Sequence, residues 1–481
     1  MTTAPPPWAD GHAAVVDLGF GDAGKGATVD LLCARRRFGA VVRANGGAQA
    51  AHNVVAPDGR HHTFSQFGAG TLAPDGPVPT HLSRFVVVDP LALAAEAVHL
   101  AAIGVASPFS LVTVDRRALI STPWHRAANH ARERARGDGR HGSCGMGVGE
   151  AMAYALARPE DAPTAGDCGH PARLRRKLRR LADHLDAVRR ELARPGTGAA
   201  ETGEGGGPAD GLAGAPANGP ADPDIEECVE ACLAFARRVR LVDEGYLPRL
   251  LARSPVVFEG AQGVLLDEWH GFHPHTTWST TTTANPLTLL AEAGRPGDVR
   301  RIGVVRTYTT RHGAGPLVSE DPGLGAVLAE PHNGAHPWQG AFRVGHFDAV
   351  AHRYAVAATG GVDSLVVTHA DAPARAGGRL RWCTAYTAPD GSFLEPSPSE
   401  APDPTRPGSA VDGASHLARQ ERLTRALLAA RPVLSAMPDS PAEAVGEALG
   451  LPLEAVTGGP TRADARVPSR SGRPVPVSAR P

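Results

Sequence analysis

Short apolar segments rich in β-branched residues alternate with helix-like segments along most of this chain. An amphipathic stretch such as 90–103 lies between many of these apolar segments. Such alternation predicts an α/β fold with a large, mainly parallel central sheet flanked by helices, because parallel strands are buried on both faces and are joined through helices. The predicted strands are 13–18, 39–43, 84–88, 110–114, 256–258, 301–305 and 364–368.

Three segments lack the apolar residues that a folded core requires. Residues 195–224 are almost entirely Gly, Ala, Pro, Asp, Glu and Thr, and residues 389–413 are rich in Pro, Ser and Asp. Such compositions cannot bury enough apolar surface to offset the entropy of ordering. We therefore expect one domain over 11–466, with a disordered insertion at 195–224, a Pro-rich surface loop at 389–413 and a disordered tail at 467–481.

A leucine stripe between residues 174 and 192 predicts an amphipathic helix, because its apolar positions recur at three- and four-residue steps. Its other face is crowded with arginines and is a candidate nucleic-acid surface. The net charge of the whole chain is −1, however, which favours a solvated helix face instead. We expect neither a nucleic acid nor a membrane as partner.

The six cysteines are scattered through a long chain, which is typical of reduced thiols rather than of a disulfide framework. Cys228 and Cys232 are one helical turn apart, and with no second pair nearby they are a weak zinc candidate. Neither a signal peptide nor a run of eighteen apolar residues is visible. We therefore expect a soluble, cytoplasmic protein.

The segment VVDLGFGDAGKG (15–26) places a glycine-rich turn between a predicted strand and a helix predicted from Ala27. Backbone N–H groups and the helix dipole in such a turn favour a bound phosphate. The spacing from Gly19 to Lys25 fits a P-loop, but Gly26 stands where that loop needs Ser or Thr for magnesium. Asp22 offers a carboxylate oxygen in its place.

Several further segments carry more polar and glycine residues than a core needs. Loops of this kind at the carboxyl ends of strands are where open α/β sheets bind ligands. The segments are RANGGAQAAHN (43–53), FEGAQG (258–263) leading into LLD and a threonine-rich run (276–283), YTTRHGAGP (308–316) and GHFDAV (345–350).

Taken in order, these motifs resemble the adenylosuccinate synthetase family. That family is marked by a GDEGKG loop, a GGNNAGHT segment, a GTTGRGIGP turn, FEGAQGxLLD, a TSSNTT-like run, AYTTRVGxGP, a GWFDAV segment and TKLD. The resemblance extends from about Val15 to Arg462. It implies a GTP- and magnesium-dependent C–N ligase and a homodimer. Such an enzyme phosphorylates the 6-oxo group of IMP and then displaces the phosphate with an amino acid amine, L-aspartate in the family.

The resemblance assigns roles around the phosphate loop. Asp22 matches the base that removes the N1 proton of the purine, and it also matches a magnesium ligand. His52 matches the group that stabilises the transferring phosphoryl, and Lys25 would bind phosphate oxygens. Ala51 would contribute a backbone carbonyl to the metal. The plain structural alternative for Asp22 is a helix N-cap. Loop positions matched to GTP binding are Gly21, Gly24 and Gly26.

Other matched positions concern the two nucleotides. Thr368 and Asp371 match the TKLD segment, whose aspartate reads guanine, although a loop aspartate could equally cap a turn. Gly459 and Pro460 match a C-terminal segment that closes over the same base. The acceptor-binding positions are Gln49, Cys144, Arg158, Gln262 and Thr277, of which Arg158 would reach the 5′-phosphate in the neighbouring subunit.

The chain departs from the family pattern most strongly just before Gly345. The family has a TTGRxRR run there, whose arginines bind the carboxylates of L-aspartate. Here the segment is GAHPWQGAFR (334–343), in which only Arg343 survives and Trp338 and Phe342 are apolar. Losing a charge-paired contact costs about 1.5–3 kcal/mol apiece, so recognition of aspartate should be weakened. A paralogue with another amine or another acceptor is therefore the alternative interpretation.

Two alternatives of other classes remain. A nucleotide-binding pseudoenzyme would have no use for the pair Asp22 and His52, so their joint presence disfavours it. A zinc protein could use His270, His273 and His275. His270 matches the family's own segment after LLD, which disfavours zinc.

Overall fold

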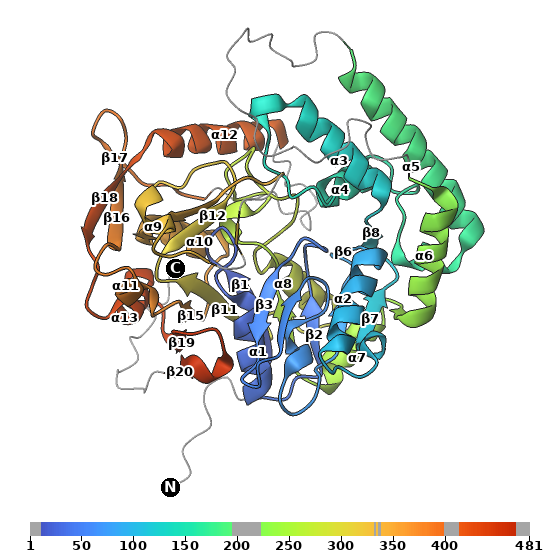
Figure 1. Cartoon of the computed structure of the whole chain (residues 1–481), viewed down its shortest axis with the longest axis horizontal. Helices are drawn as coiled ribbons and strands as arrows, with labels where there is room; N and C mark the ends of the chain where they lie inside the picture. The colour runs from blue at the N-terminus through green and yellow to red at the C-terminus, as the bar shows by residue number, and fades with distance from the viewer. Residues whose placement is uncertain (1–10, 195–222, 331–332, 335–337, 399–412, 468–481) are drawn as a thin grey trace.

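The computed structural model describes residues 11–194, 223–330, 333–334, 338–398 and 413–467, and a ten-stranded sheet runs through its centre (Figure 1). All neighbouring strands of this sheet are parallel except the last pair, β19 and β20. The expected mainly parallel α/β fold is confirmed. The strand order is β20 (Ala465–Arg466), β19 (Leu453–Thr457), β15 (Ser364–Thr368), β11 (Val299–Arg306), β1 (His12–Asp17), β10 (Val256–Glu259), β2 (Ala40–Arg43), β5 (Thr80–Leu82), β7 (Val112–Asp115) and β9 (Arg240–Val242).

Helices cover the sheet, and a group of them, α3 to α6, packs together on one side of the molecule (Figure 1). The main helices are α1 (Lys25–Arg35), α2 (Pro90–Ala102), α3 (Pro123–Ala135), α4 (Val148–Ala157), α5 (Pro171–Leu192), α6 (Ile225–Arg238), α7 (Tyr246–Arg253), α8 (Ala284–Glu292), α10 (Ala349–Ala358), α12 (Gly413–Ala429) and α13 (Pro441–Leu449). Two short helices are α9 (Pro322–Gly325) and α11 (Ala372–Arg375). The 3-10 turns are η1 (Ala69–Leu72), η2 (Pro108–Leu111), η3 (Gly137–Gly139), η4 (Ala165–Gly169), η5 (Val264–Leu266) and η6 (Arg462–Asp464).

The remaining strands form small sheets beside the main one. They are the pairs β3 (His52–Val55) with β4 (His61–Phe64), β6 (Val87–Val88) with β8 (Leu119–Ile120), and β12 (Thr309–His312) with β13 (Phe342–Gly345). A four-stranded sheet contains β14 (Phe347–Asp348), β16 (Arg381–Thr387), β17 (Phe393–Leu394) and β18 (Arg431–Ala436).

The central strands are held by burial on both faces. Val15, Val41, Val257 and Ile302 are fully buried in one core cluster, to which the leucines of α5 also belong. Each fully buried aliphatic side chain contributes about 1.5–3 kcal/mol relative to exposure. The apolar stripe of α5 is therefore a core face, as predicted. Arginines on its other face pair with carboxylates, for example Arg175 with Glu226.

Six of the seven predicted strands belong to the ten-stranded sheet, but the prediction for 84–88 was wrong. Only Val87–Val88 is a strand there, and it pairs with β8 in a separate two-stranded sheet. The place in the main sheet belongs to β5, whose Thr-His-Leu sequence has no apolar run. Helix α1 begins at Lys25, two residues before the predicted start.

The expected surface loop at 389–413 contains a short strand, β17, within its described part. The insertion predicted at 195–224 and the tail predicted at 467–481 lie almost wholly outside the described residues. Among the described residues, no helix is long and apolar enough to cross a membrane.

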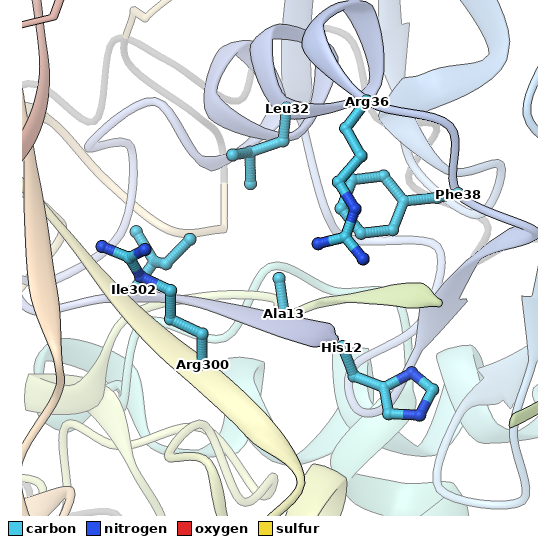
Figure 2. A pocket seen from close by; sticks show the side chains of 7 residues that line it. All are labelled: His12, Ala13, Leu32, Arg36, Phe38, Arg300 and Ile302. Carbon is cyan, nitrogen blue, oxygen red and sulfur yellow. The ribbon is translucent and has the colours of Figure 1, made fainter. Parts of the chain in front are cut away.

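The carboxyl ends of the central strands lead into the glycine loop after β1 and into the segments after β2, β10, β11 and β15. At the opposite end of the same strands, Figure 2 shows a small pocket near His12 and Arg300, where β1 and β11 begin. It is separated from the glycine loop by the length of β1. The candidate site is therefore at the carboxyl edge.

Candidate active site

The glycine loop is organised from beneath by Asp17, the last residue of β1. Its carboxylate accepts the backbone N–H groups of Gly19 at 2.8 Å and of Ala23 at 2.9 Å. It also accepts Lys25 Nζ at 2.9 Å, and both side chains of this ion pair are almost completely buried. Lys25 therefore stabilises the loop from inside. To bind a phosphate as well, its ammonium group would have to reach the phosphate while keeping the hydrogen bond to Asp17.

Asp22 lies within the glycine loop and has a left-handed backbone conformation, with a φ of 59°. Its Oδ2 lies 3.3 Å from Nε2 of His312, and its backbone carbonyl accepts Arg306 Nε at 2.6 Å. Burial raises the pKa of Asp22, but the hydrogen bond from His312 and the charges of His312, Arg306 and Lys25 outweigh it, so the pKa is lowered. The N-cap of α1 is Gly24, without a side-chain cap, so the N-cap alternative for Asp22 is wrong.

Arg306 fixes the backbone of Asp22 from the end of β11. Its guanidinium also binds the Tyr308 hydroxyl at 2.8 Å and the carboxylate of Glu330. Burial raises the pKa of Glu330, but Arg306 and the Tyr308 hydroxyl outweigh it and lower the pKa to about 2. Sequence reasoning missed Arg306 and Glu330, because neither lies in a motif and their positions are 24 residues apart.

His52, at the start of β3, packs directly against the first turn of α1. A side-chain carbon at Gly26 would come within 2.7 Å of His52 Cβ, so this position has room only for glycine. His52 Nδ1 lies 2.6 Å from Oε1 of Glu259, which is completely buried and also accepts the N–H of Ala69 at 3.0 Å. Burial lowers the pKa of His52 despite this hydrogen bond.

Glu259 itself was missed as a functional residue, although it lies in the FEGAQG motif. Burial raises its pKa, but the guanidinium of Arg43 and the hydrogen bond from His52 lower it overall. The ionised carboxylate therefore accepts from Nδ1–H of His52, which leaves Nε2 as the ring nitrogen open to a ligand.

Gln262 and Gln49 contribute unpaired polar atoms to the same region. Gln262 has a φ of 58° and follows β10, and its backbone lies against Gly21 of the glycine loop. Both amide oxygens, Oε1 of Gln262 and Oε1 of Gln49, are buried without a hydrogen-bond partner. Buried unpaired acceptors are rare in folded proteins, so these two mark a place for ligand donors.

The other positions matched to the acceptor lie in the turn before α4, at the end of α4 and in the threonine-rich run. Cys144 is half-buried in the turn that leads into α4, and burial raises the pKa of its thiol. This turn reaches the segment after β2, because a side-chain carbon at Gly47 would lie 3.3 Å from Cγ2 of Val148, the first residue of α4. Thr277 donates its N–H to the carbonyl of Leu266 at 2.8 Å. Arg158 is exposed at the far end of α4, beside the ring of Tyr154.

The positions matched to GTP binding form a second edge. Thr368 Oγ1 donates to the carbonyl of Ala23 in the glycine loop at 2.7 Å. Asp371 lies next to Gly458 of the C-terminal segment that also carries Gly459 and Pro460. Asp371 makes no side-chain cap on α11, so the turn-capping alternative is wrong, and its carboxylate pairs with Arg375 at 2.9 Å.

Arg343, the surviving arginine of the amine segment, already has partners within the chain. Its Nε donates to Glu320 Oε1 at 2.8 Å, and its Nη2 contacts the other oxygen of the same carboxylate. Its Nη1 donates to the carbonyls of Gly313 and Gly315 at 3.0 and 2.8 Å. The side chain is therefore held by the segment that follows β12.

The structure thus brings together the glycine loop, His52, Gln262 and Thr368, while Arg158 lies apart from them. Within the described part of the chain, no three His, Cys, Asp or Glu residues group as metal ligands. This applies to His270, His273 and His275 and to the cysteines on α6. The zinc alternative therefore receives no support from these residues.

The structure defines an α/β protein with a mainly parallel sheet and a glycine-rich loop between its strand β1 and helix α1. The adenylosuccinate synthetase family model matches residues 14–464. The chain belongs to the adenylosuccinate synthetase family, whose members are GTP-dependent C–N ligases.

Individual relatives support the same assignment. The adenylosuccinate synthetase of Symbiobacterium thermophilum is 32% identical over 387 residues, covering 80% of this chain and 82% of the relative. That of Desulfovibrio desulfuricans is 30% identical over 410 residues, covering 81% and 84%.

Two solved structures share the fold. Fully ligated adenylosuccinate synthetase from Plasmodium falciparum matches with a TM-score of 0.74 at 18% identity, covering 96% of this chain and all of that one. Cyanophage S-2L succinoaminodeoxyadenylate synthetase (PurZ), bound to dGMP and to dATP as an energy donor, matches with a TM-score of 0.53 at 19% identity, covering 96% and 97%.

Proposed function

We propose that this protein transfers the γ-phosphoryl group of GTP to the 6-oxygen of IMP or a similar purine nucleotide, and then displaces the phosphate with an amine. The observation that carries the proposal is an ionised carboxylate in the glycine loop, Asp22, together with an oriented imidazole, His52, that packs against the first turn of the helix after this loop. A site that only bound a nucleotide would need neither group.

The two side chains have separate roles. Asp22 would remove the N1 proton of the purine, which makes the 6-oxygen nucleophilic. His52, oriented by Glu259, would take up a proton at Nε2 when the phosphates bind, and this N–H would then stabilise the charge that develops on the transferring phosphoryl group. Once phosphorylated, the 6-oxygen is a good leaving group, and the amine can take its place at C6.

Magnesium fits the residues present. Asp22 carries an ionised, partly accessible carboxylate, and the carbonyl of Ala51 lies one residue from His52. Magnesium is usually bound by one or two protein oxygens together with substrate phosphates, so the lack of a three-residue cluster in the described chain suits it. When bound, the ion would neutralise charge on the phosphates.

The two nucleotides would occupy opposite sides of the glycine loop. For GTP, the loop amides of Gly21, Gly24 and Gly26 would hold phosphates, while Thr368, Asp371, Gly459 and Pro460 would contact the base. Asp371 would accept both donors of guanine and repel the acceptor N1 of adenine. The acceptor nucleotide would meet Gln49, Cys144, Gln262 and Thr277, of which the two glutamines offer buried unpaired oxygens.

We also propose a cytoplasmic homodimer. Arg158 is exposed at the end of α4, which suits a residue that completes the neighbouring subunit's site. All six cysteines are free thiols in the structure.

The decisive experiment is positional isotope exchange in GTP labelled at the β,γ-bridging oxygen, with IMP and magnesium and without an amine. Scrambling of the label that requires IMP would demonstrate reversible phosphorylation of the acceptor. Tight GTP binding without scrambling for any purine nucleotide acceptor would instead support the nucleotide-binding pseudoenzyme.

A further inference from the structure

One side of the site is a wall built from β12, the turn after it and residues 338–343. β12 and β13 pair antiparallel, with His312 opposite Phe342 and Arg311 opposite Arg343. At one end, His312 reaches Asp22 at 3.3 Å. At the other end lies the turn before α4 that carries Cys144 (residues 142–147, here the acceptor turn). A side-chain carbon at Gly142 of this turn would lie 3.5 Å from the backbone carbonyl oxygen of Gln339. The wall therefore borders both the proposed base and the acceptor turn, so an amine bound on it would lie beside the acceptor nucleotide of the proposed function.

The two cations of this wall are used inside the chain. The sequence contains neither Lys nor Arg between Arg311 and Arg343. Arg311 is almost fully buried and donates to the carbonyls of Ala314, Pro316 and His275. A guanidinium has five N–H donors, and four hydrogen bonds to Glu320 and two carbonyls occupy Arg343. Neither arginine can bind two carboxylates of a ligand without breaking these contacts.

The wall offers aromatic surface instead, and the guanidinium of Arg134 lies over the Trp338 ring at 5.3 Å from its centroid. The Trp338 indole stacks on the His130 imidazole of α3, with centroids 4.1 Å apart and planes 5° apart. Gly145 of the acceptor turn fits against this stack, because a side-chain carbon there would lie 2.8 Å from His130 and 3.0 Å from Trp338. The ring of Phe342 packs on the imidazole of His312, with ring centroids 4.8 Å apart.

We propose that the amine coupled by this enzyme carries a flat, apolar substituent and lacks a pair of carboxylates. It would bind on the aromatic wall formed by His130, His312, Trp338 and Phe342. The inference rests on the proposed function. The amine reacts as the free base: its lone pair forms the bond to C6, the C6–O bond breaks with its electrons leaving on inorganic phosphate, and one amine proton passes to water.

The test compares benzylamine with L-aspartate as amines, with GTP, IMP and magnesium, and identifies the products by mass. Isotope exchange without amine is measured first, because its absence means that the proposed function fails, independently of the amine. With exchange present, we expect kcat/KM for benzylamine to exceed that for L-aspartate at least tenfold. An equal or higher kcat/KM for L-aspartate, or no coupling of benzylamine, would overturn the inference.

Two variants separate recognition from folding. Trp338→Ala should lower the ratio of the two kcat/KM values about tenfold, mainly through KM for benzylamine. Glu320→Gln should release Arg343 and raise kcat/KM for L-aspartate severalfold. Phe393→Ala, on the exposed β17, is the matched control and should change neither. If Trp338→Ala lowered both values equally, Trp338 would be structural and the wall would not select the amine.

Discussion

The glycine-loop side of the site and the aromatic wall are held in different ways. On the loop side, two buried contacts fix the chain: the ion pair of Lys25 with Asp17 and the hydrogen bond between His52 and the Glu259 carboxylate. Gly26 leaves no room for a side chain there. On the wall, a half-exposed ion pair, Arg343 with Glu320, joins stacked aromatic rings.

This difference indicates where the molecule tolerates change. Removing one partner of a buried charged pair costs about 3–5 kcal/mol, whereas an exposed pair contributes about 1 kcal/mol or less. The loop side keeps Asp22, Lys25 and His52 of the family motifs, and the departure from the family is strongest at the wall. Residues for phosphoryl transfer would thus be constrained by stability, whereas residues that select the amine could change with little loss of stability.

The largest expected effect is that of Glu259→Gln. The substitution preserves shape but removes the charge that faces Arg43 and orients His52, so the free energy of unfolding should fall by about 3–5 kcal/mol. Isotope exchange should fall at least 100-fold, because the His52 ring loses its fixed orientation. Urea unfolding and the exchange assay measure the two effects.

Glu292→Gln is the control for this comparison, because Glu292 forms a half-exposed pair with Arg84. Its effect on stability should stay below about 1 kcal/mol. Comparable losses in the two variants would remove the distinction between buried and exposed pairs.

A slightly smaller effect is expected for Gly26→Ala. Alanine alone would favour helix α1 by about 1 kcal/mol. Its Cβ would lie 2.7 Å from His52 Cβ, however, so His52 must move and exchange should fall about 100-fold. Gly169→Ala, where nothing lies within 4 Å, should leave exchange intact. An active, more stable Gly26→Ala protein would show that the close approach is unimportant.

Stability should also fall in mild acid, because two buried histidines are neutral in the fold. Burial lowers the pKa from 6.5 to about 4 for His81 and to about 3 for His125. Below pH 6.5 the unfolded chain binds protons that the folded chain does not. Each of these histidines therefore lowers the free energy of unfolding by about 2 kcal/mol at pH 5. In urea unfolding between pH 7 and 5, the free energy of unfolding should fall less steeply with pH for His81→Asn than for His170→Asn, the control at an exposed site. Equal slopes would show that His81 does not cause the loss.

The sheet was predictable from sequence because its strands are buried on both faces and leave continuous apolar runs, as at Val15 and Val257. The error at 84–88 has the same origin, since an apolar run signals burial but not which sheet a strand joins. β5 carries a polar Thr-His-Leu sequence and left no signal.

The glycine loop was also predictable, because its signal is contained in residues 19–26. The contacts that orient the site were not. His52 and Glu259 are 207 residues apart, and Arg306 meets the carbonyl of Asp22 across 284 residues. Such pairs create no local periodicity, so only the fold reveals them.

The smallest effect concerns His312, which belongs to both regions because it lies on the wall and contacts Asp22. The family motif AYTTRVGxGP has valine at this position, so His312→Val removes the hydrogen bond to Asp22 Oδ2 while keeping a side chain that the fold accommodates. We expect kcat for isotope exchange to fall about tenfold, since a tenfold change is about 1.4 kcal/mol, at the lower end for a hydrogen bond to a charged group. KM for GTP should stay within about twofold.

His312→Gln restores an N–H donor at about the same distance from the backbone and should recover most of the lost kcat. Rescue by glutamine would show that His312 positions Asp22, because a residue needed only for packing would be replaced better by valine. Magnesium affinity measured by calorimetry with GTP gives a readout independent of turnover, and it should weaken in the valine variant more than in the glutamine variant. Identical behaviour of the two variants would show that His312 acts only as part of the aromatic wall. Asp22 would then be held by Arg306 through its backbone carbonyl.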